Sequence, residues 1–139
     1  KLEEMGFNVR SGVGGHGLVV DIDSGVAGPT VMLRADIDAL PYADPNDPER
    51  IEAIHACGHD AHAAILLAAA PEIRKNLKKG KIRLAFQPAE ESLQGALAMI
   101  KDGVLDGVDI VVGSHIRPVQ DLPFRKYCSV RESCCLCNR

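Results

Sequence analysis

Metal-ligating and acid–base side chains gather in three short segments of this sequence. They are His55-Ala-Cys-Gly-His-Asp-Ala-His62, Gln87-Pro-Ala-Glu-Glu91 and Gly113-Ser-His115. Thiolates, imidazoles and carboxylates are ligands that zinc, manganese and cobalt accept in proteins. A further carboxylate beside such an ion can take a proton from a metal-activated water. The three segments therefore predict the metal-binding half of a hydrolase.

The spacing within the segments supports a site more strongly than composition alone. Cys57 and His59 are two residues apart, so in a loop or strand they point the same way and can grip one metal or straddle two. Glu90 and Glu91 are adjacent, so in an extended segment their carboxylates diverge, and one can bind metal while the other faces substrate. Singly, each is an ordinary surface residue; together, with glycine and proline around each cluster, they favour a site.

A cysteine nucleophile is the rival interpretation. Cys57 as thiolate with His59 as base is a known kind of pair. Neighbours separated by one glycine rarely reach that geometry, and the rival leaves Glu90, Glu91 and His115 unexplained.

Four segments together resemble the M20 metallopeptidase family in its amidohydrolase branch. They are Leu33-Arg-Ala-Asp-Ile-Asp-Ala-Leu-Pro41, Phe86-Gln-Pro-Ala-Glu-Glu91 and the first and third segments above. The resemblance runs from about residue 6 to residue 124, in the family's order and spacing. The branch includes hippurate hydrolases, N-acyl-amino-acid amidohydrolases and plant hydrolases of auxin conjugates.

The resemblance implies a site with two divalent metal ions, which zinc, manganese, cobalt or nickel could fill. It implies Cys57 as a bridging thiolate ligand and His59, Glu91 and His115 as further ligands. Glu90 matches the family's general base. The matched segments also contain three acids to which we assign supporting roles outside the ligand set, namely Asp36, Asp38 and Asp60. They further contain His62, which the family's ligand pattern does not require.

The chemistry implied is metal-dependent hydrolysis of the amide bond of a small N-acyl amino acid. A metal pair lowers the pKa of a shared water, and Glu90 takes its proton and passes it to the leaving amine. A non-catalytic metal- or thiol-binding protein is the alternative function. A structural role through an exposed sheet is a weaker third possibility.

Hydrophobic patterning predicts an α/β fold, a helix-covered mixed β-sheet that resembles part of a zinc-peptidase catalytic domain. Residues 18–22 and 30–34 are expected as neighbouring strands, with further strands at 81–86 and 109–113, the last of a buried type. Helices are expected at 61–77, with Asp60 as N-cap and a kink or break at Pro71, and at 95–101. Each expected ligand then lies at a strand end or helix start, where open α/β sheets build their sites.

The chain divides into a partial catalytic domain at 1–124 and an atypical tail at 125–139. Residues 1–6 are expected as the last turn of a helix closed by a glycine. The tail holds four of the five cysteines, lacks zinc-knuckle spacing and does not resemble the family, which suggests an out-of-frame or read-through origin.

The resemblance further implies an inserted domain, often used for homodimerisation, and a late histidine that completes the metal site. Neither can be placed in this sequence. We therefore expect weak metal binding and little turnover.

Composition excludes other classes of protein. The chain has 139 residues, 46% hydrophobic and 25% charged, with a net charge of −3 and a pI near 5.9. This balance gives no basic footprint for nucleic acid. The sequence has no apolar stretch near membrane-spanning length, and a cytoplasmic protein with a reduced Cys57 is expected.

Overall fold

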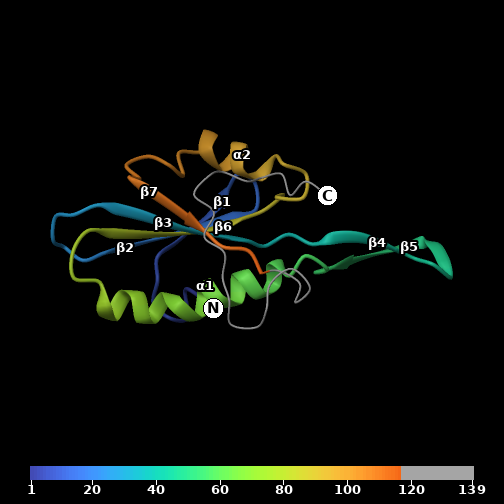
Figure 1. Cartoon of the computed structure of the whole chain (residues 1–139), viewed down its shortest axis with the longest axis horizontal. Coiled ribbons are helices and arrows are strands. Elements are labelled where there is room, and N and C mark those ends of the chain that lie inside the picture. The colour runs from blue at the N-terminus through green and yellow to red at the C-terminus, as the bar shows by residue number, and fades with distance from the viewer. Residues whose placement is uncertain (117–139) are drawn as a thin grey trace.

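Five strands form a mixed sheet in the computed structural model, which describes residues 1–116 (Figure 1). The strands are β1 (Val9–Val13), β2 (Gly17–Asp23), β3 (Thr30–Asp36), β6 (Lys81–Gln87) and β7 (Ile110–Gly113), in the order β1-β2-β6-β3-β7. β2 is antiparallel to both β1 and β6, whereas β3 is parallel to both β6 and β7. The expected helix-covered mixed sheet is confirmed.

The strands β2 and β3, expected as neighbours, are separated by β6. Leu84 of β6 lies in register with Val20 of β2 on one side and Leu33 of β3 on the other. The connection between β2 and β3 passes across the start of β6, where the Gly80 N–H donates to the carbonyl of Val26 (2.8 Å). Gly80 has φ +73°, and a Cβ there would lie 2.2 Å from the carbonyl oxygen of Pro29. The prediction of adjacency was wrong because long-range pairing of β6 with two strands is invisible to local patterning.

Helix α1 (His59–Asn76) covers one face of the sheet. Its buried residues are His59, His62, Leu66 and Ala70. Gly58, in the left-handed conformation, precedes the helix, and Asp60 lies exposed in its first turn, so Asp60 is not the N-cap. Pro71 does not split α1, which runs on through residue 76.

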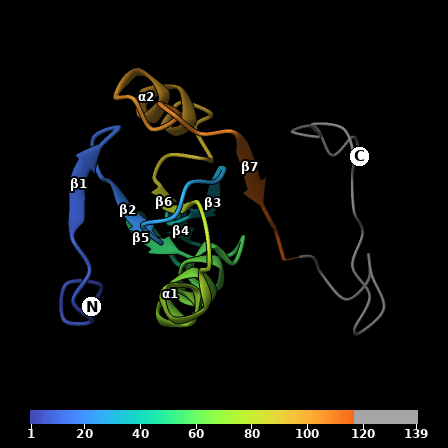
Figure 2. The same ribbon diagram turned by 90° about the vertical axis from the view of Figure 1, so that its left-hand side faces the viewer.

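Helix α2 (Gly95–Lys101) lies on the opposite face, as the second view shows (Figure 2). Met99 is 2% exposed and packs with Val13, Met32 and Ala85, which form a second small core. The main core lies under α1 and includes Val20, Leu84 and Phe86.

Strand β7 lies at an edge of the sheet and is not buried. Ile110, Val111 and Val112 are each about half exposed, because only β3 pairs with β7 among the described strands. The expected strand is therefore confirmed in place but wrong in burial.

A two-stranded hairpin, β4 (Leu40–Asp44) and β5 (Asp47–Ile54), follows β3 and projects away from the sheet beyond the carboxyl end of that strand (Figure 1). Neither of these strands was expected from the sequence. The N-terminal residues form the expected helical turn, in which the N–H of Gly6 donates to the carbonyl of Glu3 and the N–H of Phe7 donates to the carbonyl of Leu2.

Neither described helix combines the length and apolar character needed to cross a membrane. The predicted tail at 125–139 lies outside the described residues.

Leu84→Ala tests the central position of β6. Leu84 is fully buried between both neighbouring strands, so the change should lower the free energy of unfolding by about 2–5 kcal/mol. Ile65→Ala is the control, because Ile65 is 62% exposed on α1 and should change stability little. Urea unfolding of both variants checks this; equal losses would contradict the described core.

Candidate metal centre

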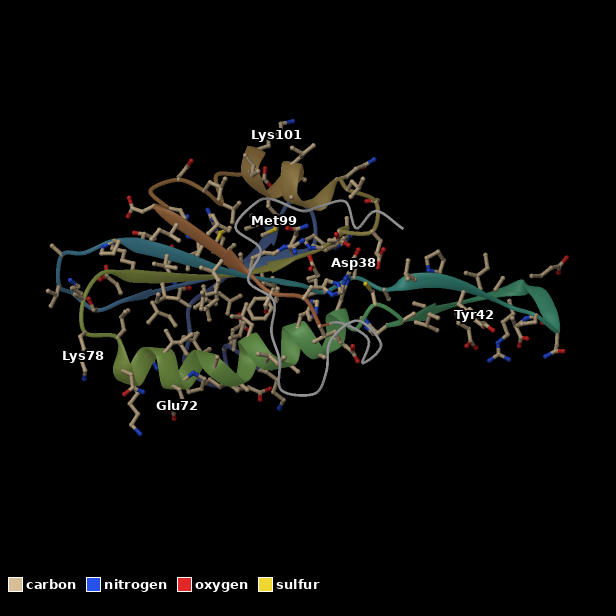
Figure 3. All side chains as sticks on the ribbon, in the orientation of Figure 1. Asp38, Tyr42, Glu72, Lys78, Met99 and Lys101 are labelled. Carbon is tan, nitrogen blue, oxygen red and sulfur yellow. The ribbon has the colours of Figure 1, made fainter. Side chains whose placement is uncertain are left out.

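The carboxyl ends of three parallel strands meet at one edge of the sheet and carry the candidate site. Asp36 ends β3, Glu90 and Glu91 follow β6, and His115 follows β7. The start of α1 brings His59 to the same edge. Asp38, labelled in Figure 3, lies between the end of the sheet and the projecting hairpin.

The position of His59 is fixed by a carboxylate. His59 is fully buried, and its Nδ1 lies 2.8 Å from Asp38 Oδ1. Because the carboxylate accepts, Nδ1 carries the proton and Nε2 keeps its lone pair. Nε2 has no hydrogen-bond partner among the described residues and lies 3.9 Å from Glu90 Oε2 and 4.0 Å from Glu91 Oε1. A buried imidazole lone pair thus faces two carboxylates.

The two glutamates do not diverge as predicted. Residues 90–93 form a turn rather than an extended segment, and Ala89 before it has φ +53°. The turn directs both carboxylates toward His59. The backbone N–H of Glu91 donates to Asp38 Oδ2 (3.0 Å), which ties the turn to the end of β3.

Cys57 and His115 meet beside His59. Cys57 Sγ lies 3.3 Å from His115 Nε2, and His115 Nδ1 donates to the carbonyl of Ile116 at 2.5 Å. Gly58 makes this approach possible, since its φ is +79° and a Cβ there would lie 2.1 Å from Ile116 Cδ1. The ligand atoms of Cys57, His59 and His115 all lie within 4.8 Å of one another.

The three predicted supporting acids have different surroundings. Asp36 is fully buried and pairs by charge with Arg34, and neither of its oxygens accepts a hydrogen bond from the residues that the structure describes. Burial raises the pKa of Asp36, and the charge of Arg34 opposes this. Burial also acts to raise the pKa of Asp38, but hydrogen bonds from Glu91 N–H and His59 outweigh it and lower the pKa. Asp60 is exposed and lies outside the cluster.

Sequence analysis did not identify the part that His62 plays in the site. It is 4% exposed, and its ring centroid lies 4.4 Å from that of His115. Burial, followed by the neighbouring His115 and His59, lowers its pKa. The signal was present: residues three apart on a helix share a face, so His59 and His62 both face the sheet.

These residues fit a divalent cation. Zinc lies about 2.0–2.2 Å from nitrogen and oxygen ligands, which places two ligand atoms of a tetrahedral ion about 3.3–3.6 Å apart. His59 Nε2 lies 3.9 Å and 4.0 Å from the two glutamate oxygens, so small side-chain movements would bring them to ligand separation. Buried charged groups need a counter-charge or a metal, and a cation placed here would satisfy the unpartnered imidazole nitrogen as well as the carboxylates.

The cysteine-nucleophile interpretation fits the structure poorly. Cys57 contacts His115 rather than His59. Burial, then the Glu91 carboxylate, raises the pKa of Cys57, so its neighbours disfavour a free thiolate.

Known proteins are similar to this chain in sequence and in fold. The pattern of peptidase family M20/M25/M40 matches residues 32–123. N-acetyl-L-cysteine deacetylase of Bacillus subtilis is 46% identical to this chain, over 84% of this chain and 30% of the deacetylase. Thermostable carboxypeptidase 2 of Saccharolobus solfataricus is 48% identical, over 83% of this chain and 32% of the carboxypeptidase. The crystal structure of B. subtilis YxeP, a dinuclear metal-binding peptidase of the M20 family, matches with a TM-score of 0.74 at 35% identity, over 84% of this chain and 34% of that one. The chain spans about a third of the length of these relatives.

Asp38→Asn tests how His59 is oriented. An amide can still accept from His59 Nδ1 but then presents an NH₂ group to the N–H of Glu91, so both His59 and the glutamate turn lose a fixed position. We expect zinc affinity to fall about 10–100-fold, measured by competition with a chromophoric chelator. Asp60→Asn removes the same charge from an exposed position near the site and should leave the affinity unchanged; equal losses would refute the proposed part of Asp38.

Proposed function

Because the chain belongs to peptidase family M20/M25/M40, we propose that it supplies the metal-binding part of an enzyme that hydrolyses the amide bond of N-acyl amino acids. The observation that carries the proposal is the unpartnered Nε2 of His59, which faces Glu90 and Glu91 at about 4 Å. A family-wide hydrolytic chemistry and a converging ligand set support it together.

In this proposal Cys57, His59, Glu91 and His115 would hold two divalent cations. Zinc, manganese, cobalt and nickel all suit a thiolate, imidazole and carboxylate set. When bound, the ions supply Lewis-acid polarisation of the amide carbonyl and of the attacking water. The dinuclear nature of YxeP, which has this fold, supports two ions rather than one.

Glu90 acts as general base and then general acid. Its side chain is 31% exposed, so it is open to solvent while its Oε2 still reaches toward the centre of the cluster. It takes a proton from the attacking water and returns it to the leaving amine. Asp38 holds His59 and the glutamate turn in place for this step.

A hollow beside the site suits a small acyl group. A cavity of about 430 Å³ borders Asp38 and Glu91, and its walls include the apolar Ile37, Ala39 and Pro88. Small-molecule sites commonly join a largely apolar wall to a few polar groups. The name of the deacetylase relative supports the same class of substrate.

The competing function is a non-catalytic metal- or thiol-binding protein. It would use the same ligands but would need no proton acceptor beside them. Glu90, which approaches the cluster without a structural hydrogen bond among the described residues, favours the enzyme.

Glu90→Gln distinguishes the two functions. The amide cannot accept a proton, so the rate should fall about 10²–10⁴-fold while bound metal is retained. Release of amine from N-acetyl amino acids is measured with protein in excess over substrate, which detects even weak turnover. Glu91→Gln is the matched change one residue away and should instead lower the metal content. Hydrolysis unaffected by Glu90→Gln would contradict the role of the base.

Metal content tests the ligand set without any substrate. Because weak binding is expected, the reduced protein is first equilibrated with excess zinc, and elemental analysis should then give about one or two ions per chain. The double variant Cys57→Ala, Glu91→Ala should lose them. A ratio unchanged in the double variant would rule out these ligands, and the expected low turnover of the chain stays a prediction.

A further inference from the structure

His62 is a buried histidine at the site for which the proposed reaction has no use. It lies one helical turn after His59 on α1 and packs edge to face against the ring of His115. Both of its ring nitrogens face polar groups, and these groups determine which nitrogen carries the proton.

The surroundings of the ring select one tautomer. The backbone N–H of Ile116 lies 2.9 Å from His62 Nε2 and can only donate, so Nε2 must hold its lone pair. A neutral imidazole then carries its proton on Nδ1. Nδ1 faces Asp36 Oδ2 at 3.8 Å, and the Asp36 carboxylate pairs with Arg34. A carboxylate beyond Nδ1 favours the proton on that nitrogen, so both neighbours of the ring select the same form.

This tautomer argues against His62 as a metal ligand. Asp36, His59 and His62 bring ligand atoms within 4.8 Å of one another, which alone would suggest a metal position. A ring nitrogen must be deprotonated to bind metal. Freeing Nδ1 would move the proton to Nε2, where it would oppose the N–H of Ile116. His59 and His115 also carry the proton on Nδ1, but their Nε2 atoms face the cluster instead of a backbone N–H.

We propose that His62 is a positioning residue, which holds the backbone N–H of Ile116 and thereby fixes the His115 imidazole opposite Cys57. The Asp36 carboxylate, 3.8 Å from His62 Nδ1 and too far to accept a hydrogen bond, adds an electrostatic preference for the same tautomer. His115 follows the end of edge strand β7 and is itself exposed, so it needs such an anchor. The consequence for metal binding rests on the proposed function; the hydrogen bond and tautomer do not.

Two matched substitutions separate positioning from packing. His62→Gln keeps an acceptor near the place of Nε2, whereas His62→Leu fills a similar volume without one. Amide hydrogen exchange should show Ile116 protected in the wild type and in His62→Gln, and exchanging faster in His62→Leu. Zinc affinity should fall about 10–100-fold in His62→Leu and be largely restored in His62→Gln.

The wild-type protein provides a test that depends on no variant. Long-range ¹H–¹⁵N spectra of the histidine rings should show His62 protonated on Nδ1, and a proton on Nε2 would overturn the proposal even if His62→Leu fails to fold. Affinity lost equally in both variants would identify His62 as a ligand instead. If the wild type binds no zinc, the proposed function fails, while the ring spectrum and the exchange of Ile116 still decide this inference.

Discussion

The hydrogen bond between His59 Nδ1 and Asp38 is the interaction on which the rest of the site depends. Asp38 follows the end of β3, His59 begins α1, and the second oxygen of Asp38 accepts from the backbone of Glu91 after β6. One carboxylate therefore joins three elements that are far apart in the chain. It also sets the tautomer of His59, so that Nε2, rather than Nδ1, is presented to the glutamates. Without that constraint the same ligand types would be close together but would not be aimed at a common point.

The sheet topology explains why these elements meet. β3, β6 and β7 run parallel, so residues that follow them emerge at the same edge, and the insertion of β6 beside β3 places the Glu90–Glu91 turn next to Asp38. Arg34 strengthens this junction, because it contacts Asp36 on its own strand and donates through Nε to Gln87 of β6 (2.9 Å). The register of the two central strands and the geometry of the site are thus held by the same side chains.

Local signals in the sequence were enough to predict most of the residues that gather, though not the part of His62, and they did not predict the directions in which the side chains point. Cys57, His59, Glu91 and His115 stand out because their chemistry is unusual and each adjoins a strand or helix boundary. The turn at Glu90 and the position of β6 between β2 and β3 depend on the left-handed Ala89 and on pairing across distant segments, which no local pattern reports. Hydropathy alone also does not identify the buried face of α1, because the apolar Ile65 is exposed while the buried face includes His59, His62 and Leu66. Burial of two histidines is favoured by their partners at the site rather than by their hydropathy.

The charge distribution at the site indicates what it is suited to bind. Burial, followed by the carboxylates of Glu91, Glu90 and Asp36, raises the pKa of the Cys57 thiol. Of these three carboxylates, only Asp36 pairs with a cation, Arg34, in the described part of the chain. A divalent cation at the cluster would reverse the sign of the local field, favour the thiolate and release its proton. Under the proposed ligand set, metal binding and deprotonation of Cys57 would therefore be one coupled event. The tautomer of His62 is instead fixed at Nε2 by the backbone N–H of Ile116, which does not titrate. The site thus combines groups whose protonation a bound cation would change with a histidine held by the backbone.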